Sequence, residues 1–216
     1  MLSKQYATEK RTNREYLLKI LSSICFVARQ GLPLRGDMDE TDLNFYQLLM
    51  LRGEDSDRPG LKAFQDKKQL KYTSIEIQNE MLDTMALQVL RDVAENLQSS
   101  SFFCFMVDET TDASNVEQVV LVFRWVDDNL AVHEEFLGLY QSDSIDAKSL
   151  VAIIRDTLFR MNLKIENCRG QCYDGASSMS GAKGGVAKLI YDDEPRAVYT
   201  HCYRHALNLS VGDTVK

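Results

Sequence analysis

The sequence predicts an α/β fold in which a mixed β-sheet flanked by helices follows an N-terminal helical region. Up to about residue 100, apolar residues recur at the spacing of amphipathic helices. After that point, short runs of β-branched and aromatic residues alternate with helical stretches. Two of the connections between predicted strands are helical crossovers, which favours parallel neighbours in part of the sheet. We therefore predict a helical region over residues 1–100 and a sheet-bearing domain over residues 101–216.

The helical region contains three predicted helices. They cover residues 12–30, 43–51 and 73–98, and a polar loop is expected at residues 54–60. Thr12 and Glu15 have the spacing of a capping box, so the first helix is expected to begin there and to end at Gly31. The third helix begins at Thr73 and carries a continuous apolar stripe to Leu97. A scaffold role is the simplest interpretation of these helices.

The second region contains five predicted strands. They are expected at residues 102–107, 116–126, 130–140, 168–173 and 197–200, with helices opening at Ser144 or Asp146, near Ala182 and at Arg204. The first strand is an unbroken apolar run, which is typical of a strand buried on both faces. A tight turn at residues 127–129 joins the second and third strands as a hairpin, while residues 168–173 are more polar than the other runs. The resulting order, β-β-β-α-β-α-β-α, is that of an RNase H-like fold.

Composition restricts the function and the environment of the chain. The net charge of −7 argues against avid, sequence-independent binding to nucleic acid, because such binding needs basic side chains that neutralise phosphates. Five cysteines, an odd number, favour reduced thiols in a cytosolic or nuclear protein. No apolar run is long enough for a membrane helix, and the polar N-terminus argues against secretion.

Two aspartates follow predicted strands and form the first candidate site. Asp108 comes directly after the first strand in VDETTD, and Asp174 directly after the fourth in CYDGASSM. If these strands are parallel neighbours, the two carboxylates converge at one edge of the sheet. Paired carboxylates hold Mg²⁺ or Mn²⁺, which can activate a nucleophile and stabilise the leaving oxygen in phosphodiester chemistry. The alternative is that each aspartate only ends a strand or caps the following turn.

Three motifs together resemble hAT-family transposases. VDETTD is similar to the first-carboxylate motif of that family, CYDGASSM to the second, and HCYRHALNLS to its Cys-x-x-His segment. From about Asn13 onward, the chain also resembles the DUF4371-type domain of zinc-finger MYM-type and related transposon-derived proteins. The resemblance implies that Asp108 and Asp174 bind the catalytic metal and that Cys202 and His205 lie near DNA. It also implies a nuclear location.

The chain departs from the family pattern in two respects. Family members often have tryptophan where this chain has Thr110. Their third carboxylate is a glutamate after a long helical insertion, and this chain stops at Lys216, where that insertion would begin. We therefore expect a truncated, catalytically incomplete domain. Asp213 is the one replacement in a suitable position, near the terminus, whereas the acidic residues 192–194 are expected to be exposed.

Neither a zinc site nor a phosphate loop fits the spacing of the residues that would form it. Cys168, Cys172, Cys202 and His205 supply ligand types, but four residues of a strand span about 13 Å. Bonds of about 2.3 Å cannot join both of the first two cysteines to one ion, so no structural zinc is expected. The glycine-rich residues 175–185 lack the spacing of a P-loop and are interpreted as a flexible connector.

The leading hypothesis is a transposon-derived RNase H-like domain that binds Mg²⁺ or Mn²⁺ weakly and is catalytically incomplete. DNA is the partner implied by resemblance, although the acidic charge of the chain weakens that expectation. The alternative is a domesticated nuclear module that binds proteins, or a second copy of itself, through the helices at residues 12–30 and 73–98. A third hypothesis is a metal-dependent nuclease completed by Asp213. No membrane partner is expected.

Overall fold

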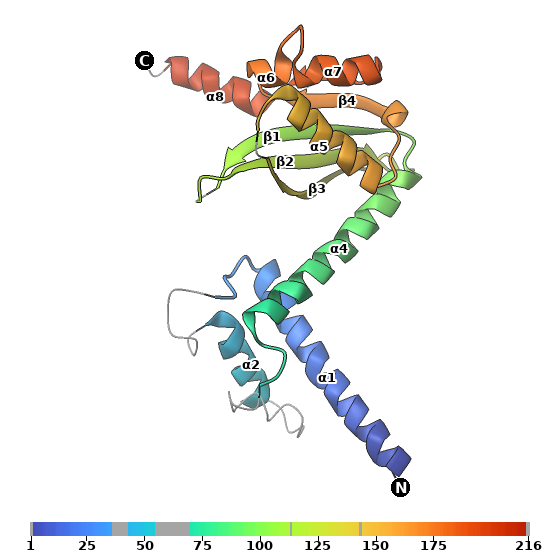
Figure 1. The fold of residues 1–216 in the computed structure, drawn as a ribbon, viewed down its shortest axis with the longest axis vertical. Coiled ribbons are helices and arrows are strands. Elements are labelled where there is room, and N and C mark those ends of the chain that lie inside the picture. The colour runs from blue at the N-terminus through green and yellow to red at the C-terminus, as the bar shows by residue number, and fades with distance from the viewer. Residues whose placement is uncertain (1, 36–42, 55–69, 113, 143, 215–216) are drawn as a thin grey trace. The chain divides into compact units, whose positions relative to one another are not determined.

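The computed structural model describes residues 2–35, 43–54, 70–112, 114–142 and 144–214, which Figure 1 shows as ribbon. Packing divides the chain into two compact units, Met1–Gln88 and Val89–Lys216. The division falls inside the long helix α4 (Ile75–Ser99), earlier than the domain boundary expected near residue 100, which stays a prediction. Among the described helices, none is both long enough and apolar enough to span a membrane.

The first unit is helical, as predicted. Helices α1 (Leu2–Arg29) and α2 (Asn44–Glu54) pack with the beginning of α4. Their shared core contains buried side chains at helical spacing, namely Tyr16, Ile20, Ile24, Phe45 and Leu49. The Tyr16 hydroxyl accepts a hydrogen bond from the backbone N–H of Lys71 (2.7 Å), which ties the chain before α4 to α1.

The beginning of α1 differs from the prediction. The helix starts at Leu2 rather than Thr12, and the Thr12 hydroxyl donates to the carbonyl of Thr8 (3.1 Å). Because that bond runs back inside the helix, Thr12 does not act as a cap. The predicted end is confirmed by Gly31, which has a left-handed φ of 65°. Most of the polar loop expected at residues 54–60 lies outside the described residues.

The second unit contains a five-stranded sheet, as predicted. Its strands are β1 (Phe103–Thr111), β2 (Glu117–Val126), β3 (Val132–Gln141), β4 (Cys168–Tyr173) and β5 (Val198–His201). Their order across the sheet is β3-β2-β1-β4-β5. Strands β1, β2 and β3 pair in antiparallel fashion, whereas β4 pairs with β1 and β5 in parallel. The mixed sheet with helical crossovers confirms the predicted α/β, RNase H-like class.

Helices cover one face of the sheet and part of the other. The described helical segments after β3 are α5 (Ala147–Arg160), a 3₁₀ turn (Ile165–Asn167), α6 (Ser177–Ser180), α7 (Val186–Asp193) and α8 (Tyr203–Thr214). Figure 1 shows α5 lying across the strands. Alternate residues of β1, including Phe103 and Phe105, share one core with α4, α5 and α7. The opposite face carries Met106 and Asp108, and α8 lines a hollow there.

Two connections show how local sequence determines the ends of helices. Of the two capping residues expected for α5, the structure uses Asp146, whose carboxylate accepts from the backbone N–H groups of Lys148 and Ser149. Hydrogen bonds from Ser144, Ser149 and these amides hold the pKa of Asp146 well below its usual range. The connector at residues 175–185 contains one helical turn, α6, in place of the uninterrupted flexible segment that the sequence predicts.

Candidate functional site

Asp108 in β1 and Asp174 directly after β4 line the same hollow. Met106 of β1 pairs with Cys172 of the parallel strand β4, and each aspartate lies two residues further along the chain. Residues two apart in a strand point to the same face, so both side chains lie on the face that carries Met106. Adjacent strands are about 4.8 Å apart, which brings the two carboxylates close together. One detail differs from the prediction, because β1 continues to Thr111 and Asp108 lies within it.

Each of the two carboxylates is oriented by its own backbone. Asp108 Oδ1 accepts from the backbone N–H of Glu109 (3.1 Å), and Asp174 Oδ1 accepts from that of Ala176 (3.0 Å). The Tyr199 hydroxyl donates to the carbonyl of Asp174 (3.1 Å), which anchors the chain just after β4. The Oδ2 atoms of Asp108 and Asp174 take part in none of the hydrogen bonds among the described residues. Carboxylate oxygens are the ligand type that a hard divalent cation prefers.

A hollow of about 490 Å³ contains this acidic pair. Its floor is the face of β1, β2 and β4 that bears the aspartates, and α8 supplies its wall. Three polar side chains of α8 line it, namely Arg204, His205 and Asn208, together with Cys202 just before the helix. The hollow therefore combines anionic groups with groups that bind phosphate or nucleobases. It also brings the predicted Cys202 and His205 beside the predicted aspartates.

The two cysteines of β4 and Cys202, directly after β5, fall into two environments. Cys168 is fully buried in the core, and burial raises the pKa of its thiol to about 12. Cys172 lines the hollow on the opposite face with Cys202. Burial is the main cause of a raised pKa at Cys172, followed by its contact with Cys202. Cys168 thus faces away from Cys172, Cys202 and His205, the other three possible zinc ligands. Within the described ranges, no group of three or more His, Cys, Asp or Glu is arranged to hold a metal ion.

Glu109 is a further acidic residue of this region that the sequence does not single out. Its Oε1 atom is buried and has no hydrogen-bond partner among the described residues. The pKa of Glu109 is raised, first by burial and then by repulsion from Asp174, Glu117 and Asp108. Strand alternation assigns it to the face opposite Asp108, so a sequence pattern would place it away from the site. The structure instead makes it an electrostatic neighbour of Asp174.

Replacing Glu109 by glutamine is expected to stabilise the protein at pH 7, because it removes a partly buried charge that its acidic neighbours repel. The gain is up to about 1 kcal/mol, because solvent screens part of this repulsion. A carboxyl whose folded-state pKa is raised binds its proton more tightly in the folded state. Its ionisation therefore costs stability as the pH rises from the unfolded pKa through the folded one. The gain in Glu109→Gln should vanish below about pH 4, where the glutamate is protonated in both states. Urea denaturation at pH 7 and pH 4 measures both values.

Glu95→Gln, on the exposed side of α4, is the control with the same change of charge. An equal gain in that variant would show that overall charge, and not the neighbourhood of Asp174, is responsible.

The remaining acidic candidates lie elsewhere. Asp192 pairs with Lys188 and Asp193 with Arg155 on the outer side of α7. The expectation that residues 192–194 are all exposed is wrong for Glu194, which is 3% exposed because Arg196 covers it with hydrogen bonds to both carboxylate oxygens. The side chain of Asp213 lies outside the described set. Thr110, at the position where the hAT family often has tryptophan, is exposed near the end of β1.

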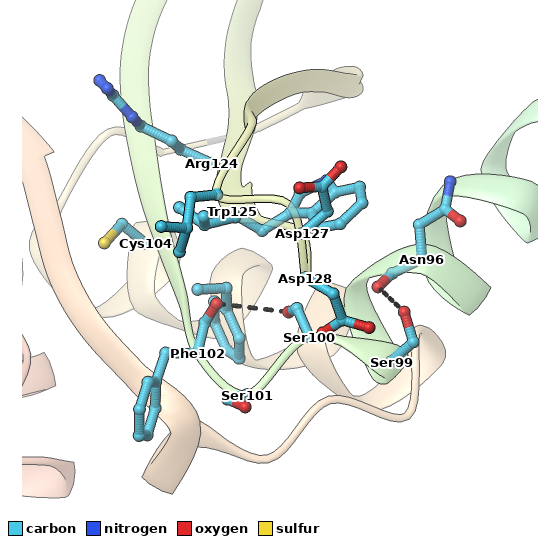
Figure 2. Close-up of a pocket in the computed structure, with 13 residues that line it drawn as sticks. Asn96, Ser99, Ser100, Ser101, Phe102, Cys104, Arg124, Trp125, Asp127 and Asp128 are labelled. Carbon is cyan, nitrogen blue, oxygen red and sulfur yellow. Dashed lines mark hydrogen bonds between the residues drawn. The ribbon is translucent and has the colours of Figure 1, made fainter.

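A larger hollow of about 710 Å³ lies near the start of β1 and the β2–β3 turn. Figure 2 shows the Ser99 hydroxyl hydrogen-bonded to the backbone carbonyl of Asn96, and the Ser100 hydroxyl to that of Phe102. Arg124 points away from both serines. Arg124 also pairs with Glu134 of β3 (3.2 Å). These polar groups are therefore engaged within the protein. The smaller hollow with the paired aspartates remains the candidate site.

The strand order and the carboxylates at the β1–β4 edge define an RNase H-like α/β domain with a candidate acidic site. The chain belongs to the DUF4371 family, described as the ZMYM1/FAM200, RNase-like domain, which it matches over residues 1–185. It is also 27% identical to the human 52 kDa repressor of the inhibitor of the protein kinase and 28% identical to the mouse protein of that name. Both alignments cover 96% of this chain and 28% of the relative. The chain thus spans less than a third of the length of these relatives.

Proposed function

We propose that this chain is the RNase H-like part of a transposon-derived protein of the hAT type. In this proposal, Asp108 and Asp174 bind one Mg²⁺ or Mn²⁺ ion, and the α8 side of the hollow faces a DNA strand. The observation that carries the proposal is that Asp108 and Asp174 each lie two residues beyond the paired Met106 and Cys172 of parallel strands and line one hollow. Hard divalent cations prefer such oxygen ligands.

The opposite wall of the hollow supports nucleic acid as the partner. Arg204 can neutralise a phosphate, and Asn208 lies one helical turn further along α8. His205 belongs to the Cys-x-x-His segment, and its ring is in edge contact with that of His201 (centroids 6.0 Å apart). A phosphate group bound to the cation would therefore face Arg204, His205 and Asn208 across the hollow. The net charge of −7 disfavours strong, sequence-independent binding to DNA, so we propose contact through this local surface.

As this chain stands, we propose that it binds metal weakly and does not cleave or join DNA strands. Among the described residues no third ligand completes the site, and efficient phosphodiester chemistry needs a rigid, complete metal centre. We further propose a nuclear location, an assignment compatible with the term repressor in the names of the human and mouse relatives.

Addition of Mn²⁺ is expected to raise the melting temperature of the protein, because a ligand that binds only the folded state stabilises it. At ten times the dissociation constant the gain is about 1.4 kcal/mol, or about 4 °C for a domain of this size. Asp108→Asn and Asp174→Asn should each abolish the Mn²⁺-dependent shift, since each removes one of only two carboxylate ligands. Thermal unfolding with and without the metal measures the shift.

Asp128→Asn makes the same change of charge in the β2–β3 turn, at the other hollow, and should keep the full shift. An unchanged melting temperature of the native protein at millimolar Mn²⁺ would contradict the metal site. It would favour the second candidate function, a protein-binding module. That candidate is supported by exposed apolar side chains on α1, of which Leu18 and Phe26 are 49% and 48% exposed.

A further inference from the structure

Two cysteines lie in the lining of the candidate site. Cys172 of β4 and Cys202, directly after β5, both line the 490 Å³ hollow. Cys202 lies directly beyond the last paired residues of these two strands. The backbone N–H of Cys202 also donates to the carbonyl of Tyr173 (2.8 Å), which continues the β4–β5 ladder by one residue. Neither thiol is fully buried, so a small oxidant can reach both of them.

The backbone geometry determines what has to move when these sulfurs bond. Cys172 pairs with Thr200 of β5, and Cys202 comes two residues after Thr200. Strands about 4.8 Å apart with a rise of about 3.3 Å per residue put such diagonal Cα atoms about 8 Å apart, which is more than the usual span of a disulfide. Cys202 stands where β5 gives way to α8, a junction that can shift more easily than the middle of a strand. Bond formation would therefore draw the start of α8 towards β4.

We propose that Cys172 and Cys202 form a reversible intramolecular disulfide in the floor of the hollow. With a low-molecular-weight disulfide such as oxidised glutathione as the oxidant, both S–H bonds break and one S–S bond forms. The two electrons and two protons pass to glutathione, which leaves as two thiols. The cross-link moves Arg204 and His205, on the first turn of α8, closer to the aspartates. Thiol oxidation thus becomes a means of changing access to this site.

Peptide mapping after oxidation tests the proposal. The whole chain, free of metal, is incubated with oxidised glutathione, alkylated and digested with trypsin. Each cysteine then falls in a separate peptide, with Cys172 in residues 170–183 and Cys202 in residues 197–204. The expected product is one species that joins these two peptides, at their summed mass less about 2 Da. Dithiothreitol before alkylation should return both peptides to the free, alkylated form.

Cys172→Ser and Cys202→Ser should each eliminate the joined species. Cys104→Ser removes a thiol from the same face of the sheet and should leave it intact, and circular dichroism checks that all three variants are folded. The proposal is overturned if Cys172 and Cys202 are found only reduced or separately bound to glutathione, or if the cross-link joins another pair. Because no metal is present, this result does not depend on whether Asp108 and Asp174 bind a cation.

Discussion

Phe105→Ala is expected to lower the unfolding free energy of the sheet-bearing unit by about 3–5 kcal/mol, the usual cost of removing a buried aromatic ring. Phe105 is fully buried in the middle of β1. Its ring centroid lies 5.9 Å from that of Phe123 and 6.2 Å from that of Tyr173, so it packs against both neighbouring strands. Alanine would leave a cavity between β2 and β4 that rigid strands cannot close. Trp125 is the only tryptophan of the chain and lies in β2, so its fluorescence during urea denaturation reports on this unit.

Phe159→Ala provides the matched control. Phe159 lies on α5 and is 83% exposed, so its removal should change the unfolding free energy by less than about 0.5 kcal/mol. Similar losses in the two variants would contradict the assignment of the core to the α5 face of the sheet.

Much of the fold can be predicted because its signals are local. The hairpin between β2 and β3 and the cap of α5 both depend on residues close together in the chain. The true length of β1 is not a local property, since residues 108–111 are polar or acidic and resemble the start of a loop. They remain in the strand because β2 pairs with them as far as Thr111, opposite Glu117. Likewise, the first ten residues of α1 show no apolar periodicity that would predict a helix.

Some features of the candidate site can likewise be predicted from the sequence, whereas others depend on the assembled tertiary structure. The relation between Asp108 and Asp174 depends on the parallel pairing of β1 and β4, which the alternation of strands and helices along the chain is compatible with but does not determine. The wall formed by Arg204 and Asn208 depends on the direction in which α8 leaves β5, and no spacing in the sequence determines that direction. Glu109 also escapes prediction, because its raised pKa arises from charges on other segments. Such electrostatic neighbours become visible only when the strands are assembled.

Gln171 explains why β4, the strand with the weakest sequence signal, is nevertheless an interior strand of the sheet. The side chain is 1% exposed, and its Nε2 atom donates to the carbonyls of Ala187 (3.1 Å) and Ala197 (2.9 Å). Its Oε1 atom accepts from the Tyr173 hydroxyl (2.9 Å). The glutamine therefore joins β4 to α7 and to the segment before β5. A buried polar residue that is fully hydrogen-bonded is compatible with a core strand.

Gln171→Leu is expected to cost about 2–4 kcal/mol, because the shape of the side chain is roughly kept while its buried partners lose their hydrogen bonds. Tyr173→Phe should cost about 1–2 kcal/mol, since it leaves only the glutamine oxygen without a donor. The double variant should then lose less than the sum of the two, because no orphaned hydroxyl remains when both partners are apolar. Denaturation followed by Trp125 fluorescence gives the three free energies, and their difference is the coupling energy. Strict additivity would show that the bond between Tyr173 and Gln171 does not contribute to stability.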